Sequence, residues 1–381
     1  MKEIGIYIHI PFCMQKCLYC DFISYANQQD KMEAYIEALK KEIEEVVKET
    51  DKEEVMVSTI YIGGGTPSYI GSKQIVEVVR RIKENFVIMP EAEITIEINP
   101  GTVTKEKLQD YKKVGINRIS IGLQATQNHL LQKIGRIHTY EQFLDTYEQI
   151  KEVGFKNKNI DLMIGLPDQT IEDVKESIRK VSTLDPTHIS VYSLIIEEGT
   201  PIEKKIKKGE YILPAEELER QMYWTVKAML EEQGYEQYEI SNFAKKGYFS
   251  KHNWNCWKQK EYFGFGVAAH SYWNGKRYSN LESIEEYIEN IKNGEKQKNV
   301  ILQEIQTKEE MQKEYMLLGL RTLEGISIKR FKEKFGCNPI FLYHKELERL
   351  VEENLIEIDL DQIRLTKKGL DFANLVWEEF V

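Results

Sequence analysis

Hydrophobic and polar positions follow two periods along the first half of the chain. Six short runs have the alternating or continuous β-branched pattern of strands, at residues 4–10, 55–62, 92–98, 118–122, 160–164 and 188–194. Amphipathic segments with helical spacing separate or follow them, at residues 31–50, 75–86, 105–114, 140–153, 171–182 and 214–233. Repeated strand–helix units imply a parallel sheet with right-handed crossovers. Because six units are too few to close an eight-stranded barrel, the sequence predicts an α/β fold built as an open, partial barrel.

The second half of the chain has a different pattern. Residues 239–279 are rich in aromatic and turn residues, and residues 292–304 are polar and charged with few apolar anchors. The C-terminal part has helical patterns around a hairpin at residues 357–365, which resembles a winged helix. We therefore expect four parts, namely a barrel core at 1–200, a barrel extension at 201–291, a linker at 292–306 and a small, mainly helical domain at 307–381.

Charge and hydropathy exclude several classes of protein. The 381 residues include 52 Lys and Arg against 62 Asp and Glu, a net charge of −10, which argues against a broad nucleic-acid surface. Residues 307–381 carry 12 basic and 15 acidic residues, so the winged-helix-like part is not expected to bind DNA either. No apolar run approaches the roughly 20 residues of a membrane span, and the N-terminus lacks the pattern of a signal peptide. We expect a cytoplasmic protein.

Three of the five cysteines lie within eight residues, directly after the first predicted strand. Cys13, Cys17 and Cys20 are spaced by three and then two residues. Clustered thiols in a reducing compartment indicate metal or redox chemistry, and thiolates are ligands for iron–sulfur clusters and for zinc. Three thiolates on a four-iron cluster would leave one iron open to a further ligand. The residues alone leave two alternatives, a zinc site completed by His9 or a distant side chain, and a redox pair of Cys17 and Cys20.

This cysteine spacing, with the aromatic Tyr19 before the last cysteine, resembles the signature of the radical S-adenosylmethionine superfamily. The resemblance implies a partial (β/α)6 barrel and a [4Fe-4S] cluster held by Cys13, Cys17 and Cys20. Its open iron would take the amino and carboxylate groups of S-adenosylmethionine. Within the superfamily the chain is most similar to the anaerobic coproporphyrinogen III oxidase-like group, over nearly its whole length and including a HemN-like C-terminal domain. The matching segments are residues 7–13, 63–67, 117–118, 122–124 and 161–167.

Polar residues and glycines follow several predicted strands, where α/β folds place their sites. The glycines at 63–65 would let backbone amides approach an anion, although a plain tight turn is the alternative. Asp161 lies inside an apolar run and needs a partner, for which Arg136 is a candidate; surface positions are the alternative for Glu97 and Arg136. The resemblance implies that one or two S-adenosylmethionine molecules contact these residues and their neighbours: Tyr7, Tyr19, Gly64, Gly65, Thr66, Glu97, Gln124, Arg136 and Asp161.

The aromatic segment contains a second candidate site. Its residues 252–257, His-Asn-Trp-Asn-Cys-Trp, are similar to the His-Asn-x-x-Tyr-Trp motif of the HemW haem chaperones, with Cys256 where that motif has tyrosine. Histidine and cysteine both ligate haem iron, and aromatic side chains can face a planar ring. A hydrogen-bonded core histidine is the alternative for His252. The resemblance makes His252 the candidate haem-facing residue.

Four functions are compatible with these patterns. The first is a haem chaperone that binds haem, a [4Fe-4S] cluster and S-adenosylmethionine, and passes haem to an acceptor protein in the cytosol or at a membrane. The second is an oxygen-independent coproporphyrinogen III oxidase, the third another radical enzyme that modifies haem, and the fourth a zinc-stabilised binding module. The oxidases typically have a fourth cysteine at the position of Phe22. They also have an N-terminal extension before the cysteine motif, whereas the matching motif begins here at Tyr7. We therefore do not expect oxidase activity. The sequence leaves open whether the chain forms a homodimer.

Overall fold

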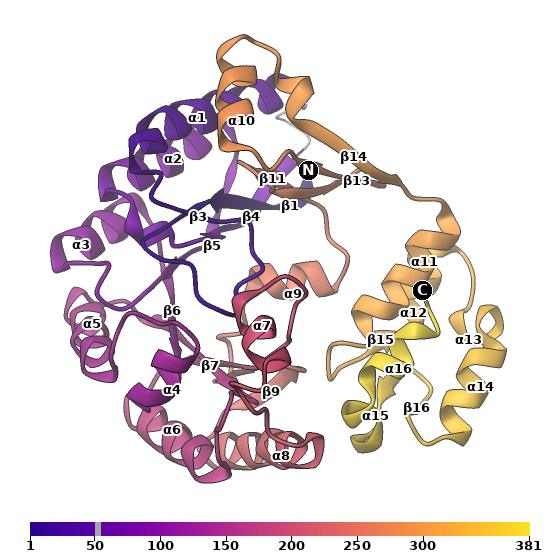
Figure 1. Ribbon diagram of the computed structural model, residues 1–381. Helices are drawn as coiled ribbons and strands as arrows, with labels where there is room; N and C mark the ends of the chain where they lie inside the picture. Colours follow the sequence, from indigo (N-terminus) through magenta and orange to yellow (C-terminus); the bar gives the residue numbers. More distant parts are fainter. Residues whose placement is uncertain (50–54) are drawn as a thin grey trace.

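A computed structural model describes residues 1–49 and 55–381 and has the predicted α/β architecture (Figure 1). One mixed sheet of twelve strands spans these ranges, in the order β14-β13-β12-β11-β1-β4-β5-β6-β7-β8-β10-β9. The seven neighbours from β11 to β8 are parallel. Six of them correspond to the predicted strands: β1 (Lys2–Ile10), β4 (Val55–Gly64), β5 (Ile88–Ile98), β6 (Arg118–Gln124), β7 (Asn157–Ile164) and β8 (His188–Ser193). The prediction of an open, partial barrel is confirmed.

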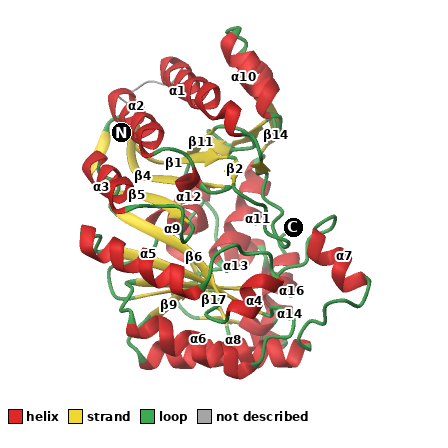
Figure 2. Cartoon of the chain, turned by 60° about the vertical axis from the view of Figure 1, so that its left-hand side comes forward, coloured by secondary structure: helices red, strands yellow, loops and turns green. Residues whose placement is uncertain are grey.

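The predicted helices cover the outer face of this sheet, as Figures 1 and 2 show. They are α1 (Met32–Glu49), α2 (Ser72–Asn85), α3 (Lys105–Val114), α5 (Tyr140–Val153), α6 (Ile171–Thr183) and α8 (Glu216–Glu232). Residue 50, the expected end of the first helix, lies outside the described residues. Short helices α4 (Asn128–Lys133) and α7 (Pro201–Lys207) were not expected. Threonine caps begin several helices; the Thr139 hydroxyl, for example, accepts from the Gln142 amide at the start of α5.

The aromatic segment extends the sheet at both of its edges. With its flanking residues it forms seven elements over residues 236–292: β9 (Glu236–Glu239), β10 (Asn242–Ala244), α9 (Lys251–Trp257), β11 (Tyr262–Phe265), β12 (His270–Trp273), β13 (Lys276–Asn280) and α10 (Ile284–Lys292). Strand β11 pairs in parallel with β1, so a segment read only as aromatic and turn-rich supplies the seventh parallel strand. The segment expected as a linker, 292–306, contains β14 (Val300–Ile305), which pairs with β13. Strand β14 lies at the edge of the sheet and most of its side chains are exposed, so its residues show no hydrophobic pattern from which the strand could be predicted.

The C-terminal domain has a hydrophobic core of its own and lies beside α9 in Figure 1. Its helices are α11 (Lys308–Gly319), α12 (Ile328–Phe335), α13 (Pro339–Leu342), α14 (His344–Glu352), α15 (Lys367–Asp371) and α16 (Ala373–Glu378). The predicted hairpin is present as β16 (Ile356–Ile358) and β17 (Gln362–Leu365), joined by β15 (Ile326–Ser327). The guanidinium of Arg321 lies between Trp257 of α9 and Trp377 of α16, 4.6 and 4.4 Å from the ring centroids. Cation–π contacts thus join this domain to the helix that carries His252.

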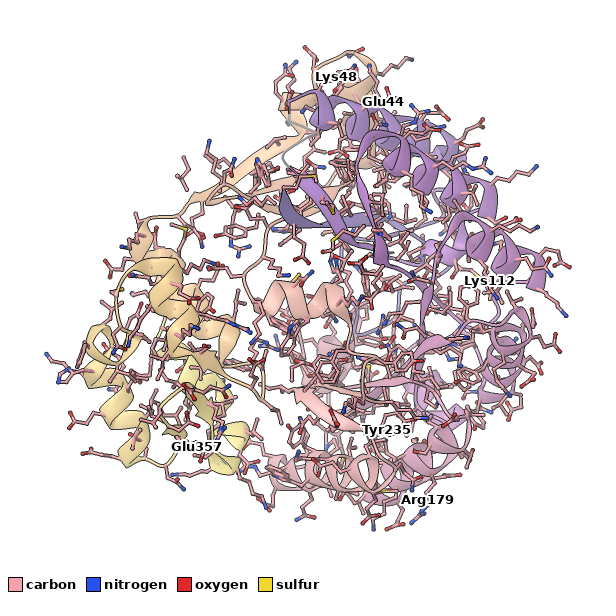
Figure 3. The ribbon with its side chains drawn as sticks, turned by 180° about the vertical axis from the view of Figure 1, so that it is seen from behind. Glu44, Lys48, Lys112, Arg179, Tyr235 and Glu357 are labelled. Carbon is pink, nitrogen blue, oxygen red and sulfur yellow. The ribbon has the colours of Figure 1, made fainter. Side chains whose placement is uncertain are left out.

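The outer helices of the barrel carry charged side chains. Glu44, Lys112 and Arg179, labelled in Figure 3, lie on the outer helices α1, α3 and α6. Within the described residues, no helix combines the length and the apolar character that crossing a bilayer demands.

Candidate cofactor-binding sites

Two adjoining cavities lie on the inner side of the barrel. One, of about 460 Å³, is lined by all three clustered cysteines and by residues in or just after the carboxyl-terminal parts of β4, β5, β6 and β7. The other, of about 650 Å³, is lined by His252 and Cys256 of α9 and by Tyr7 and His9 of β1. We call them the cysteine cavity and the α9 cavity. The two share six lining residues: Asp21, Phe22, Tyr61, Gly64, Glu97 and Tyr192.

A loop held at both ends and in the middle presents the cysteines. Its ends are tied by β2 (Phe12–Cys13) and β3 (Tyr25–Ala26), which pair in parallel. In the middle, the Leu18 amide donates to the Ile134 carbonyl, and the Leu18 carbonyl accepts from the Ile202 amide, both at 3.0 Å. The loop can therefore hold three thiols in place before any metal binds.

Burial keeps two of these thiols protonated in the metal-free protein. It raises the pKa of Cys13, and burial together with the neighbouring Cys17 raises the pKa of Cys20 to about 11. A metal ligand must be the thiolate, so binding of a metal or cluster has to release these protons.

The glycine turn after β4 packs directly on the cysteine loop. The amides of Gly65 and Thr66 donate to the carbonyls of Ile10 and Phe12 at 2.9 and 2.8 Å. A Cβ at position 65 would lie 2.8 Å from the Cys13 sulfur, and Gly64 has a φ of +113°. These two amides are occupied by the protein's own carbonyls, whereas the Gly64 amide hydrogen-bonds the Glu97 carboxylate, so one of the three glycines does bring its backbone N–H to a carboxylate. The glycines are required here because the two loops approach so closely.

Four hydrogen bonds connect the thiols of Cys13 and Cys17 through three side chains. Arg136 Nη1 donates to Cys17 Sγ at 3.6 Å, and Arg136 Nη2 donates to Asn99 Oδ1 at 2.7 Å. Asn99 Nδ2 in turn donates to Thr66 Oγ1 at 2.9 Å, and that hydroxyl donates to Cys13 Sγ at 3.9 Å. We call Thr66, Asn99 and Arg136 the thiol arc.

The arc also corrects the partner expected for Asp161. Within the described residues Arg136 bonds Cys17, Asn99 and the Gly122 carbonyl, and no ion pair joins it to Asp161. Asp161 instead accepts from Asn159 Nδ2 at 2.7 Å and from the Ser120 hydroxyl at 3.1 Å. Burial raises its pKa. Short polar side chains on the same and neighbouring strands satisfy this carboxylate, which spacing along the chain could not show.

Glu97 and Tyr61 form the wall between the cavities. Tyr61 donates its hydroxyl to Glu97 Oε1 at 2.7 Å, and its ring lies 5.2 Å from the His252 ring and 6.3 Å from the Tyr7 ring. Burial, with a smaller contribution from Asp161, raises the pKa of Glu97 to about 7. This carboxyl can exchange a proton near neutral pH, while Tyr61 contacts groups in both cavities.

His252 lies on the inner face of α9 and is 7 % exposed. Its Nδ1 hydrogen-bonds Thr59 Oγ1 at 2.9 Å, and its backbone amide donates to Glu93 Oε1 at 3.3 Å. Nε2 has no hydrogen-bond partner among the described residues. Burial, assisted by the Arg118 charge, lowers the His252 pKa to about 4, so the imidazole is neutral at neutral pH. A neutral imidazole anchored through one nitrogen is suited to ligate a metal through the other.

The predicted site residues fall on these two cavities. The cysteine cavity is lined by Cys13, Cys17, Tyr19, Cys20, Gly64, Gly65, Thr66, Glu97, Gln124, Arg136 and Asp161. Tyr7 and His252 line the α9 cavity, so the structure separates Tyr7 from most of the residues grouped with it. Sequence reasoning missed Tyr61 and Asn99 as site residues. Their only signal was position, since each lies at the carboxyl-terminal part of a parallel strand or just after it.

The donor set fits an iron–sulfur cluster better than a single zinc ion. A tetrahedral zinc site needs four ligands at about 2.0 to 2.3 Å from one point. In the described part of the chain no three His, Cys, Asp or Glu side chains are placed to hold one ion. Three thiols spread over one cavity beside further polar groups suit a cluster in which each thiolate binds its own iron.

Two family models match the chain. Residues 7–181 match the Radical SAM superfamily, and residues 306–372 match the HemN C-terminal domain.

Curated relatives match over the full length. The chain is 39% identical over 379 residues to the protein named Heme chaperone HemW of Bacillus subtilis, covering 98% of both chains. It is 38% identical over 380 residues to the Lactococcus lactis protein of the same name, covering 100% of this chain and 98% of that one. Among solved structures, coproporphyrinogen III oxidase (HemN) from Escherichia coli aligns with a TM-score of 0.86 and 23% identity. The alignment covers 100% of this chain and 90% of that chain. At this identity the likeness establishes the fold.

Proposed function

Because the chain belongs to the HemW family of radical S-adenosylmethionine proteins, we propose that it is a haem chaperone with two joined binding sites. In this proposal Cys13, Cys17 and Cys20 hold a [4Fe-4S] cluster, and S-adenosylmethionine occupies the rest of the cysteine cavity. Haem is cargo in the α9 cavity, close to His252. The main support for this proposal is that a cavity lined by the three cysteines and a cavity lined by His252 lie side by side and share wall residues.

The sizes and linings of the cavities support this division. Both volumes fall within the range of pockets for small ligands and cofactors, roughly 300 to 1,000 Å³. The cysteine cavity offers Glu97 and Asp161 to an amino group or a ribose, and Arg136 to a carboxylate. The α9 cavity offers tyrosine rings and a neutral imidazole, the groups that a flat, apolar, iron-containing ligand would use.

In this proposal the chain's own residues bind and orient the cofactors and the haem. The cluster, when bound, would supply the electron for reductive chemistry at S-adenosylmethionine. Thr59 orients the imidazole of His252, and Tyr61 holds the Glu97 carboxyl at the wall. Glu97 can hold or release a proton near neutral pH. The haem-accepting protein would have to reach the opening of the α9 cavity. We propose that the protein works in the cytoplasm, because clustered thiols stay reduced there.

Haem titration of anaerobically purified protein tests the proposal. Replacing His252 with Ala should weaken binding and change the Soret band, whereas His344→Ala, on the exposed surface of the C-terminal domain, should leave both unchanged. His270 also lines the α9 cavity, so His270→Ala tests which histidine ligates the iron. Wild-type affinity and spectrum in His252→Ala would remove His252 from the site.

The oxidase remains the second candidate, because the fold is that of coproporphyrinogen III oxidase. Anaerobic incubation with coproporphyrinogen III, S-adenosylmethionine and a reductant distinguishes the two. Under the chaperone proposal the porphyrinogen is recovered unchanged; formation of protoporphyrinogen would favour the oxidase.

A further inference from the structure

The thiol arc does not belong to the ligand set, yet it reaches two of the three thiols that the proposed function gives to the cluster. Each of its hydrogen bonds has a fixed direction. The guanidinium can only donate, so Asn99 must present its oxygen to Arg136 and its amide group to Thr66. With its lone pair accepting from Asn99, the Thr66 hydroxyl is left to donate toward Cys13. Asn99 is thereby oriented by both of its neighbours.

The arc leaves the third cysteine out. No arc residue bonds Cys20, whose sulfur instead has the Phe22 backbone amide close by. The arc is also well protected, since Thr66 is 6% exposed and Arg136 Nε is a buried donor without a partner in the described residues. A positive charge and two donors therefore act on one side of the thiol set.

We propose that Thr66, Asn99 and Arg136 set the reduction potential of the cluster by donating hydrogen bonds, and placing one positive charge, at Cys13 and Cys17. This inference rests on the proposed function, since it requires the cluster. Reduction adds an electron to the cluster and makes its sulfurs more negative. Donors and a cation at those sulfurs stabilise the reduced state and raise the potential. Asn99 is the positioning residue, because it touches neither sulfur and acts by orienting the other two side chains.

The test is a redox titration of the reconstituted cluster followed by electron paramagnetic resonance. It is run without S-adenosylmethionine, because Thr66 and Arg136 also line the space proposed for that cofactor. Thr66→Val removes one donor at nearly constant volume, and Arg136→Met removes the charge and the other donor. Both should shift the midpoint to more negative values, with the larger shift in Arg136→Met, and Asn99→Ala should shift it in the same direction.

A matched control is available on a neighbouring strand. Thr95 is fully buried on β5 and its hydroxyl has no partner among the described residues, so Thr95→Val should leave the midpoint unchanged. Iron and sulfide analysis accompanies every titration. Wild-type midpoints in Thr66→Val and Arg136→Met with full iron content would overturn the inference while leaving the proposed cluster intact. If Arg136→Met does not assemble a cluster, Thr66→Val and Asn99→Ala decide alone. A wild-type protein that assembles no cluster would overturn the proposed function, and this inference with it.

Discussion

Replacing Thr59 with Val should weaken haem binding without disturbing the fold. Thr59 is fully buried on β4, and its hydroxyl is the partner of His252 Nδ1 at 2.9 Å. A histidine that ligates a metal is oriented by the hydrogen bond on its other ring nitrogen. Valine keeps the shape of threonine and removes only that bond, so the imidazole loses its anchor while the surrounding packing stays.

The size of the effect follows from one hydrogen bond. A buried, neutral hydrogen bond contributes about 1 kcal/mol net, which corresponds to about a fivefold change in an equilibrium constant. Loss of orientation adds to this, because removing a side chain that positions a metal ligand costs 10- to 100-fold in several metal sites. We therefore expect the dissociation constant for haem to rise about 5- to 50-fold in Thr59→Val, and Thr59→Ser to recover most of the affinity.

The assay is a haem titration followed at the Soret band, alongside thermal unfolding of the haem-free protein. Thr95→Val serves as the matched control, since it deletes an equally buried hydroxyl that bonds nothing in the described residues. Unchanged affinity and an unchanged Soret band in Thr59→Val would refute the reasoning. So would an equal loss in Thr95→Val, because the effect would then come from general loosening of the sheet.

Three further predictions follow from the geometry. Gly65→Ala places a Cβ 2.8 Å from the Cys13 sulfur, so iron and sulfide content should fall well below wild type, whereas Gly71→Ala, at the start of α2, should retain both. Glu97→Gln should stabilise the protein at high pH. Between pH 4.5 and about 7 the Glu97 carboxyl holds a proton in the folded protein and releases it in the unfolded chain, so the stability of the wild-type protein falls as pH rises. Glutamine carries no such proton and avoids this loss. The gain should be absent below pH 4.5 and reach at most about 3 kcal/mol above pH 7, and urea unfolding that shows no such trend contradicts the assigned environment. Arg321→Met should lower the free energy of unfolding by about 1 to 3 kcal/mol, because it removes the cation–π contacts of Arg321 with Trp257 and with Trp377. A thermal unfolding curve identical to wild type would show that these two contacts do not stabilise the protein.

The sequence was informative where local pattern and spacing carry the structure. Strand β1 alternates, helices α3, α5 and α6 begin at threonine caps, and the cysteines follow β1 at a fixed spacing, so the partial barrel and the thiol set were predictable. Strand β11 was missed because its four residues, Tyr262–Phe265, are aromatic and glycine-containing and do not alternate. Strand β14 was missed because five of its six side chains are exposed at a sheet edge, where backbone pairing decides the structure.

Partners that are distant in sequence could not be predicted. Arg136 was expected to pair with Asp161, but the turn before α5 directs it to Cys17 and Asn99. The role of Asn99 depends on side chains 33 and 37 residues away in opposite directions, and Thr59 meets His252 across 193 residues. Such pairs are set by the register of the parallel strands and by the packing of α9 against β4, which no local pattern encodes.

The wall between the cavities gives the fold a means to link their contents. Tyr61 contacts the His252 ring and donates to Glu97, so a ligand that engages the Glu97 carboxylate competes with the Tyr61 hydroxyl for the same oxygens. A change in that hydrogen bond alters the position or mobility of a ring that packs on the imidazole of His252, the residue proposed to face haem. Any free energy transferred in this way is reciprocal, so under the proposed function haem in the α9 cavity would alter affinity in the cysteine cavity by the same factor. The arrangement differs from two independent sites on one scaffold, because a single tyrosine forms part of both.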